Sequence, residues 1–439
     1  RPCAHSQVWQ SVINSEDKRI RELIGGAAQA AAAGRPYDSD RLLRLAENQA
    51  PNHPLVLNEV GKRKLLAGDP AGALAVLEQA LEAEPQSPAF RLNLATALRD
   101  LNRRDEELTQ LNRVLTAEPT NMRALLQAGA SHEFRQDSRA AAATYRKALM
   151  LIPPGAPIPA EMRAILDHAR RVVDANARAL EAFLDSHLEA ARAQHAGEPL
   201  NRFDKSLATF LQKRRVYRPQ PTFIYVPELP AIEFFPREDF PWLDEIEAAA
   251  DDIREELIGV LAEGHEVLEP YIALQATPDE KWRALNNSRN WGVFYLWKAG
   301  EAIAANMARC PKTVAALSAW PKCELPGSAP TAVFSILEPR TRIPPHTGVN
   351  NARLICHLPL IVPPGCGFRV GAETRQWEPG KAFVFDDTIE HEAWNDSGEA
   401  RAVLIFDIWN PYVTPAEREM VSALTTGVEQ FYGSLPSYL

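Results

Sequence analysis

The chain has few cysteines for its length and lacks the spacing that structural zinc sites use. Five cysteines occur among 439 residues, and no two of them form a Cys-x-x-Cys pair: Cys3, Cys310, Cys323, Cys356 and Cys366. A structural zinc site is therefore not expected. Cys310 and Cys323 could pair if their loop folds back, but free thiols in a reducing, cytoplasmic compartment are the simpler interpretation. The first residue is Arg1 rather than Met, so we expect that an N-terminal segment has been removed and that localisation is weakly determined.

Long apolar runs and an excess of positive charge are also absent. No run approaches the roughly eighteen apolar residues that a membrane span requires, so we expect no span. The formal net charge of −9 argues against a nucleic-acid partner bound through bulk charge. The length exceeds that of one compact core, which predicts two or three domains.

Proline recurs in the N-terminal part with a fixed spacing of 34 residues, at Pro51, Pro85, Pro119 and Pro153. Small residues recur with this period where two helices must approach, at Gly61, Ala95 and Gly129. A fixed period of this length is typical of a solenoid of helix pairs. The pattern resembles the tetratricopeptide repeat, although the middle unit departs from it at Glu107 and Val114.

We therefore predict an all-α solenoid with three tetratricopeptide repeats in residues 51–153, capped by helices in 1–50. A helical connector, 154–218, should contain one long helix over 160–196, with apolar residues near helical spacing from Ile165 to Phe183. Such repeats stack to bury their apolar faces. A concave helical surface of this kind usually binds a peptide or protein segment, or serves as a scaffold without a catalytic role.

Proline and aromatic residues increase sharply after Arg215, which indicates a second domain over residues 219–439. One amphipathic helix is predicted over 242–263. Short β-rich segments separated by Pro or Gly follow, over 293–298, 332–337, 353–362, 367–370, 381–385 and 402–409. This spacing predicts a sandwich or barrel of the jelly-roll kind.

Two histidines and an arginine are the candidate functional residues of this domain. His346 is expected in a Pro-rich loop after a strand, His391 follows the segment that ends at Phe385, and Arg401 opens the next strand. Two neutral imidazoles on a β scaffold suit Fe(II), and a nearby guanidinium suits a dicarboxylate. Each residue alone is weak support, since Arg401 could equally be a surface residue paired with Glu399.

Strand alternation places Arg353, Ile355 and His357 on one face. A guanidinium and an imidazole that point inward are costly unless a ligand meets them. The alternative is an edge position in which this face meets solvent.

Several blocks of the second domain resemble the aspartyl/asparaginyl β-hydroxylase family of Fe(II)- and 2-oxoglutarate-dependent oxygenases. The resemblance runs from about Pro227 to Pro411 and is densest at 334–339, 346–348 through 357–358, 377–381 through 385–387, 390–394 and 407–411. It implies a double-stranded β-helix (jelly-roll) domain with flanking helices. Some members of the family also carry tetratricopeptide repeats ahead of this domain.

By position, the resemblance implies that His346 and His391 bind Fe(II). It implies that Ser335 and Arg401 hold the distal carboxylate of 2-oxoglutarate, and that His357 lies near the carboxylate beside the keto group. The family has an Arg where this chain has Ile355, and Arg353 on the same face is the candidate substitute. Gly348 stands where other oxygenases have a carboxylate ligand, which agrees with the family. The resemblance further implies that Asp386, Asp387 and Glu390 stabilise loops.

The resemblance implies a dioxygenase that uses Fe(II), 2-oxoglutarate and O2 to hydroxylate an aspartyl, asparaginyl or similar residue and releases succinate and CO2. The repeats suggest that the substrate is a peptide or protein. Three alternatives stay open at this point: a halogenase, since Gly348 leaves room for chloride; a small-molecule or lipid hydroxylase; and a non-catalytic repeat scaffold.

Overall fold

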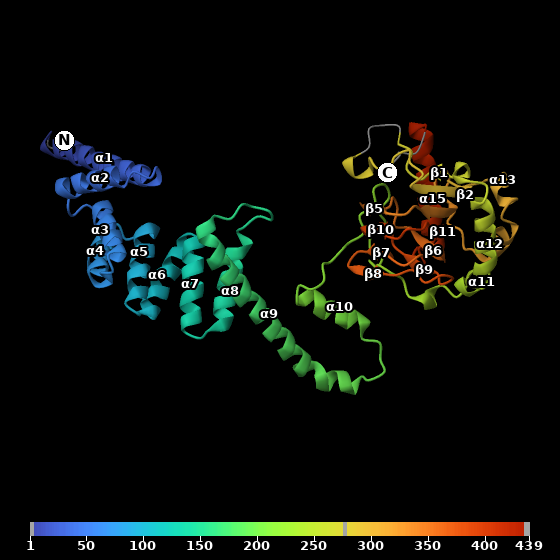
Figure 1. Ribbon diagram of the computed structural model, residues 1–439, viewed down its shortest axis with the longest axis horizontal. Helices are drawn as coiled ribbons and strands as arrows, with labels where there is room; N and C mark the ends of the chain where they lie inside the picture. The colour runs from blue at the N-terminus through green and yellow to red at the C-terminus, as the bar shows by residue number, and fades with distance from the viewer. Residues whose placement is uncertain (1–3, 275–278, 434–439) are drawn as a thin grey trace. The chain divides into compact units, whose positions relative to one another are not determined.

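The computed structural model describes residues 4–274 and 279–433. The chain divides into two compact units, Arg1–Glu198 and Pro199–Leu439, which are described separately (Figure 1). The first unit is entirely helical in its described part. Its helices are α1 (Ala4–Ala32), α2 (Pro36–Gln49), α3 (Pro54–Leu66), α4 (Pro70–Ala83), α5 (Pro88–Asp100), α6 (Arg104–Ala117), α7 (Met122–Phe134), α8 (Ser138–Met150) and α9 (Ala160–Gln194).

Helices α3 to α8 form three antiparallel pairs that stack in sequence order, as the 34-residue period predicts. Each of the four repeated prolines lies two or three residues beyond the end of a second helix, where it cannot continue the helix. The small residues permit close helix contact. A Cβ on Gly61 would lie 2.6 Å from the Leu77 side chain, and one on Gly129 would lie 2.4 Å from the Tyr145 ring.

The departure of the middle repeat has a structural explanation. Glu107 is fully buried, where a small residue stands in the other repeats. Its carboxylate accepts hydrogen bonds from Arg104 at 3.0 Å and from Gln127 at 3.2 Å. A buried carboxylate that is paired in this way is tolerated in a helix interface.

The long helix α9 buries less of its predicted apolar side than expected. Its buried residues are Leu166 and Ala169, whereas Ile165 and Phe183 are exposed. The reason is that α9 packs against α7 and α8 through its first turns only. No described helix is both long and apolar enough to cross a membrane.

The second unit contains two antiparallel sheets that face each other. The larger has the order β1-β2-β4-β11-β6-β9, with β3 paired to β2, and the smaller has the order β5-β10-β7-β8. Their strands are β1 (Glu269–Pro270), β2 (Trp291–Lys298), β3 (Glu301–Ala302), β4 (Ala332–Leu337), β5 (Thr341–His346), β6 (Arg353–Ile361), β7 (Cys366–Val370), β8 (Glu373–Arg375), β9 (Phe383–Phe385), β10 (His391–Asn395) and β11 (Arg401–Trp409).

Helices cover the outer face of the larger sheet and leave its inner face for the site. Apolar residues of α11 (Leu243–Ala248) and α12 (Ala250–Leu261) pack on outward-facing strand residues such as Phe334 and Leu404. These two helices lie where one helix was predicted, over 242–263. The predicted helix is interrupted at Ala249, which adopts φ −91° and ψ 3°. The remaining helices are α10 (Asn201–Phe210), α13 (Ala304–Met307), α14 (Pro311–Ala316) and α15 (Pro415–Tyr432).

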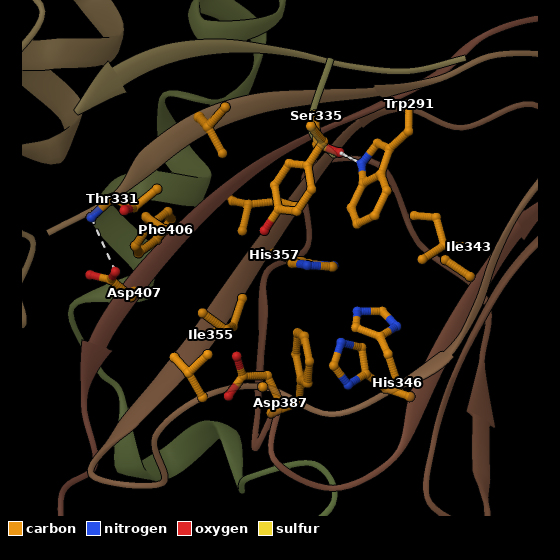
Figure 2. Close-up of a pocket in the computed structure, with 18 of the residues that line it drawn as sticks. Trp291, Thr331, Ser335, Ile343, His346, Ile355, His357, Asp387, Phe406 and Asp407 are labelled. Carbon is orange, nitrogen blue, oxygen red and sulfur yellow. Dashed lines mark hydrogen bonds between the residues drawn. The ribbon is translucent and has the colours of Figure 1, made fainter. Parts of the chain in front are cut away.

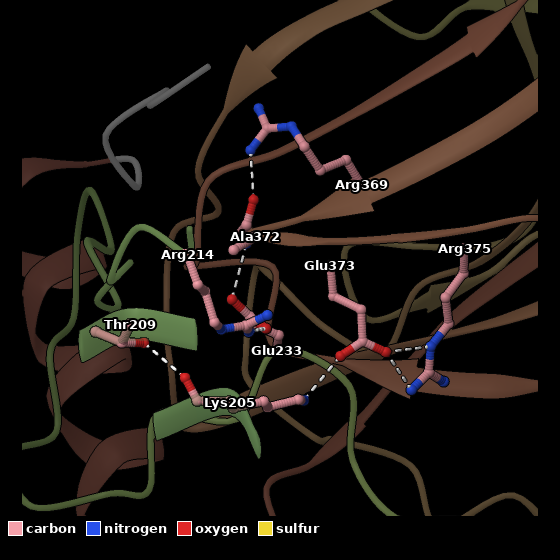
Figure 3. Close-up of polar contacts among 9 residues, drawn as sticks. Lys205, Thr209, Arg214, Glu233, Arg369, Ala372, Glu373 and Arg375 are labelled. Carbon is pink, nitrogen blue, oxygen red and sulfur yellow. Dashed lines mark hydrogen bonds and ion pairs between the residues drawn. The ribbon is translucent and has the colours of Figure 1, made fainter. Parts of the chain in front are cut away.

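Helix α10 is attached to the edge of the smaller sheet by polar contacts (Figure 3). Lys205 donates to Glu373 of β8 at 2.8 Å. Farther along, Arg214 pairs with Glu233, whose carboxylate also accepts from the backbone N–H of Ala372 at 2.8 Å. The segment that precedes the β-rich region is thus anchored to it, so α10 belongs to the second unit.

Candidate active site

A cavity of about 340 Å³ lies between the two sheets of the second unit (Figure 2). It collects side chains from β2, β4, β6 and β11 on one side and from β5, β7 and β10 on the other. All six predicted site residues line it: Ser335, His346, Arg353, His357, His391 and Arg401. The inward orientation of Arg353 and His357 excludes the edge alternative, since His357 is only 6% exposed.

His346 and His391 are neighbours across two paired strands. His346 ends β5 and lies opposite His391, which opens β10, and their ring centroids are 4.1 Å apart. The prediction that His346 lies in a loop was wrong. Strand β5 contains Pro344 and Pro345 and lies at the edge of its sheet, which is where prolines are tolerated in strands.

Both imidazoles are held in one tautomer by the backbone. The Nδ1 of His346 lies 2.8 Å from the carbonyl of Pro344, and the Nδ1 of His391 lies 3.1 Å from the carbonyl of Ile389. A carbonyl oxygen only accepts, so each Nδ1 carries the proton and each Nε2 retains its lone pair. Neutral histidines with a fixed tautomer are the usual ligands of a divalent metal ion.

Burial keeps the two rings neutral. It lowers the pKa of His346 to about 3, with a further contribution from the neighbouring His391. It also lowers the pKa of His391 to about 4. At neutral pH a proton therefore does not compete with a metal ion for Nε2 of either ring.

Asp387 occupies the space beside Gly348. A Cβ added to Gly348 would lie 2.2 Å from Oδ2 of Asp387, and the backbone N–H of Gly348 donates to the carbonyl of Asp387 at 2.6 Å. A larger residue at position 348 would therefore displace the Asp387 carboxylate. Gly348 is thus required by packing as well as being the residue that the family resemblance implies.

Arg401 is a buried cation that meets no carboxylate in the described ranges. Its side chain is 1% exposed, and its guanidinium lies over the ring of Trp377 at 4.6 Å. Its guanidinium donates a hydrogen bond to the carbonyl of Ser335 at 3.4 Å, and its Nε has no partner among the residues that the structure describes. Burial lowers the pKa of Arg401 to about 10. An uncompensated charge of this kind indicates an anionic ligand.

Ser335 and His357 lie beside Arg401 in the same part of the cavity. The hydroxyl of Ser335 accepts a hydrogen bond from Nε1 of Trp291 at 3.1 Å, which leaves its own proton free to donate. His357 is surrounded by aromatic rings, among them Phe385 at 4.9 Å, and its buried Nδ1 has no partner in the described part of the chain. Burial lowers its pKa well below the usual value, so the ring is neutral.

Arg353 is paired with two carboxylates instead of being free. Its terminal nitrogens lie 3.4 Å from Asp387 and 3.2 Å from Asp407. Burial alone would lower the pKa of Arg353, but the charges of Asp387 and Asp407 raise it further than burial lowers it. Its Nε is buried and has no hydrogen-bond partner among the described residues.

The other acidic residues near His391 are engaged in local contacts. Asp386 accepts from the N–H of Thr388 at 2.9 Å and from its hydroxyl at 2.5 Å. Glu390 pairs with Arg369 at 3.0 Å. Within the described ranges, no set of three or more His, Cys, Asp or Glu side chains forms a metal site. The two imidazoles are the side chains that could hold a metal ion here.

Sequence reasoning missed Trp291, Trp377 and Asp407. Asp407 lies on the same face of β11 as Arg401 by strand alternation, so its acidic side chain in an otherwise apolar strand was a signal of an inward-facing group. The two tryptophans gave no comparable signal, because a buried tryptophan usually serves only in packing.

The four described cysteines, Cys310, Cys323, Cys356 and Cys366, are buried free thiols. Cys310 and Cys323 are thus unpaired, in agreement with the simpler interpretation of the sequence. Cys3 lies outside the described residues.

Two comparisons with family models identify the parts of the chain. Residues 247–411 match the model described as Aspartyl/Asparaginyl beta-hydroxylase. The chain carries an aspartyl/asparaginyl β-hydroxylase domain. Residues 64–131 match the Tetratricopeptide repeat model, so tetratricopeptide repeats precede the hydroxylase domain, as predicted.

Curated relatives share the hydroxylase domain but differ in length. The human "Aspartyl/asparaginyl beta-hydroxylase" is 37% identical over 164 residues, which is 37% of this chain and 21% of that protein. The "Ornithine lipid ester-linked acyl 2-hydroxylase" of Rhizobium tropici is 38% identical over 180 residues, which is 40% of this chain and 60% of that protein. The match thus spans about a fifth of the human relative and under two thirds of the bacterial one.

A solved structure is similar to part of the chain. A mutant of the Thermobaculum terrenum O-GlcNAc transferase is 22% identical, with a TM-score of 0.30, over 33% of this chain and 28% of that chain.

Proposed function

We propose that the protein is an Fe(II)- and 2-oxoglutarate-dependent dioxygenase that hydroxylates an aspartyl, asparaginyl or similar residue of a peptide or protein. The observation that carries this proposal is Arg401, a buried guanidinium without a carboxylate partner in the described ranges, in the same cavity as two neutral histidines of fixed tautomer. The donor set fits a metal ion that is chelated by a dicarboxylate.

In this proposal each residue has a defined task. His346 and His391 would hold Fe(II) through Nε2. Arg401 and the Ser335 hydroxyl would bind the distal carboxylate of 2-oxoglutarate, and Trp291 and Trp377 would position them. His357 would lie near the carboxylate beside the keto group, and Arg353 remains a predicted further contact.

When bound, the iron would activate O2 with electrons from 2-oxoglutarate, which becomes succinate and CO2. The chain itself would orient the cosubstrate and exclude water. The aromatic residues around His357 and the apolar residues Val333 and Ile405 make this part of the cavity wall apolar, which would strengthen an ion pair between Arg401 and a carboxylate.

We propose further that the two sheets form a double-stranded β-helix. The supporting observation is that strands β4 to β11 divide equally between the sheets, in the orders β4-β11-β6-β9 and β5-β10-β7-β8. This arrangement agrees with two facing four-stranded sheets of the jelly-roll kind.

The repeats are proposed to hold the polypeptide substrate. A groove of about 840 Å³ lies along α5, α7 and α9 and is lined by apolar residues such as Leu126 and Met162.

We also propose a reducing, cytoplasmic compartment, on the basis of the buried free thiols.

Purified protein tests the proposal directly. With Fe(II), 2-oxoglutarate and Asp- or Asn-containing peptides, we expect succinate and a peptide product that is heavier by one oxygen atom. His346→Ala and His391→Ala should each abolish both products. Absence of succinate and of oxidised peptide from the wild-type protein would refute the proposal and favour a non-catalytic scaffold.

A second candidate substrate is an acyl chain. The cavity wall is apolar at Val333, Ile355 and Ile405, and the Rhizobium tropici relative is named for an acyl 2-hydroxylase activity. Oxygen added to an ornithine lipid, with none added to peptides, would favour this candidate.

Halogenation is less well supported, because the Asp387 carboxylate fills the space beside Gly348 and would repel chloride. Product masses with and without chloride test it.

A further inference from the structure

The groove along α5, α7 and α9 has a positively charged wall. Arg99, in the last turn of α5, and Arg123, in the first turn of α7, both line it. Burial lowers the pKa of Arg123, and the nearby charge of Arg99 lowers it further. Two like charges that lie close together are unfavourable unless an anion meets them. The wall therefore suits a negatively charged group.

The described part of the chain does not neutralise this wall. The guanidinium of Arg123 donates to the hydroxyl of Thr96 at 3.2 Å, which is uncharged, and no described carboxylate forms an ion pair with it. Arg99 pairs with Asp100 at 3.1 Å, but both side chains are 38% exposed. Water screens an exposed pair of this kind, so it contributes little. Both guanidinium groups thus remain available to an anion in the groove.

Glu133 is the one carboxylate among the described residues that line the groove. Its oxygens accept a hydrogen bond from the Tyr145 hydroxyl at 2.6 Å and lie 2.8 Å from Nε2 of His168. These contacts join α7 to α8 and α9. The Glu133 carboxylate is therefore held by its own neighbours and leaves the two arginines to a ligand.

The rest of the groove is largely apolar. Its lining includes Met122, Leu126, Met162 and Ile165, and Ile165 is 49% exposed. Apolar residues that gather at a hollow surface beside charged ones are typical of a surface that contacts another protein. An extended peptide directs alternate side chains to opposite sides. One peptide can therefore present acidic side chains to the arginines and apolar side chains to this lining.

We infer that this groove binds an extended peptide segment in which acidic and apolar residues alternate. A carboxylate of the segment would accept hydrogen bonds from the guanidinium groups of Arg99 and Arg123, each of which offers several donors. The whole chain has a net charge of −9, so the attraction has to come from these two local cations. This preference deepens the proposed role of the repeats in holding a polypeptide and rests on it.

The binding of three fluorescein-labelled peptides to the full chain tests the inference. The peptides share Leu at alternate positions and differ in the residues between, which are Glu, Gln or Lys. Fluorescence anisotropy with Fe(II) and 2-oxoglutarate, but without O2, measures affinity in the absence of turnover. At low ionic strength we expect the Glu peptide to bind at least about tenfold more tightly than the Gln peptide, because charge-assisted hydrogen bonds replace neutral ones. The Lys peptide should bind more weakly than either.

Two double variants assign the preference to the groove. Arg99→Gln combined with Arg123→Gln removes both cations and should lower the affinity for the Glu peptide about tenfold, to that of the Gln peptide. Arg35→Gln combined with Arg44→Gln is the matched control, because it changes the net charge equally. Those two side chains are 61% and 72% exposed and form local pairs, so the control should leave all three affinities unchanged. Circular dichroism checks that each variant is folded.

A third variant tests the apolar part of the groove. Ile165→Ser removes exposed apolar surface without changing the charge. It should weaken the binding of the Glu and Gln peptides by the same factor of about three, because both peptides carry the same Leu residues.

Each of several results would overturn the inference. They are equal affinities for the Glu and Gln peptides, tighter binding of the Lys peptide, a preference for Glu that survives loss of both arginines, and unchanged binding in Ile165→Ser. A wild-type dimer that dissociates when both arginines are replaced would assign the groove to a second copy of the chain and also overturn it. Sedimentation velocity measures this.

Failure of the peptide preference and failure of the hydroxylase function are distinguishable. The hydroxylase function is measured by succinate and oxidised peptide in the presence of O2, and none of the binding results bears on it. Absence of succinate while the Glu peptide still binds would refute the hydroxylase function alone.

Discussion

At the scale of single residues, the site is defined by groups that the protein leaves without partners. Arg401 is buried, and its guanidinium contacts the ring of Trp377 and one backbone carbonyl. Desolvation of a guanidinium destabilises the fold unless an anion meets it. The chain therefore accepts a cost in stability that a bound dicarboxylate would offset.

Replacing this arginine should separate stability from ligand binding. Arg401→Met removes the uncompensated charge and keeps much of the volume, so without ligand we expect the free energy of unfolding to rise by on the order of 2 kcal/mol. The affinity for 2-oxoglutarate should fall about a hundredfold. Thermal unfolding with and without 2-oxoglutarate measures both effects.

Arg342→Met is the matched control, because that guanidinium is 62% exposed and pairs with Asp396. Arg342→Met should leave both the free energy of unfolding and the affinity for 2-oxoglutarate nearly unchanged. If Arg401→Met retained the stabilisation that 2-oxoglutarate gives the wild type, the assignment of Arg401 to the distal carboxylate would be wrong.

Asp386 predicts a dependence of stability on pH. Burial raises its pKa from 3.8 to about 7, so the folded state binds this proton more tightly than the unfolded state does. Its contribution to stability is complete below pH 3.8 and is lost as the pH rises through about 7. Asp386→Asn keeps the acceptor for Thr388 and should raise the free energy of unfolding at pH 8 by about 1–3 kcal/mol.

Urea unfolding at pH 4 and pH 8 measures this difference. At pH 4 the variant and the wild type should agree to within about 0.5 kcal/mol. Asp251→Asn, with a side chain that is 85% exposed, should show no such pH dependence. An equal effect of Asp386→Asn at both pH values would contradict the account.

At the scale of elements, the sequence predicts best where a pattern is long or strictly periodic. The helix pairs follow the 34-residue period, and the predicted strand over 332–337 coincides with β4. Strands β5 and β10 escaped prediction because β5 contains two prolines and β10, His391–Asn395, contains no β-branched residue. Helix α15 was also missed, although Thr414 and Glu417 form a capping box at its start.

The candidate site was predicted as far as local sequence carries the information. The histidines, Ser335 and Arg401 occur in recognisable blocks, and the structure brings them into one cavity. The ion pairs of Arg353 could not be predicted, because they join residues 34 and 54 positions apart whose approach depends on strand register.

The close helix contacts of the repeats give an element-scale prediction. A methyl group at Gly129 would meet the Tyr145 ring at 2.4 Å, so Gly129→Ala should lower the free energy of unfolding of the first unit by about 1–3 kcal/mol. Gly25→Ala is the control, since nothing lies within 4 Å of a Cβ there, and it should be neutral or stabilising by up to about 1 kcal/mol. Calorimetry measures the free energy of unfolding of both variants. Equal changes in Gly129→Ala and Gly25→Ala would exclude the packing explanation.

At the scale of the whole molecule, the division at Glu198 and Pro199 separates the two proposed tasks. All residues assigned to the metal ion and the cosubstrate lie in the second unit, and the groove proposed for polypeptides lies in the first. Each unit has its own hydrophobic cores, which is expected of segments that fold independently.

Residues 199–439 expressed alone should therefore fold and bind 2-oxoglutarate with an affinity within about threefold of the full chain. Peptide oxidation should need roughly tenfold more substrate, because the contribution of the repeats to binding is lost. Titration calorimetry and peptide kinetics on both proteins measure this. An unchanged Michaelis constant for peptide would show that the repeats do not hold the substrate.

The most direct test of the central claim is the fate of 18O2 in a reaction with Fe(II), 2-oxoglutarate and peptide. We predict that succinate and the oxidised peptide form in equal amounts, that each carries one labelled oxygen atom, and that His391→Ala yields neither. Failure of the wild-type protein to form labelled succinate, or equal amounts from the His391→Ala variant, would contradict an oxygenase built on His346, His391 and Arg401.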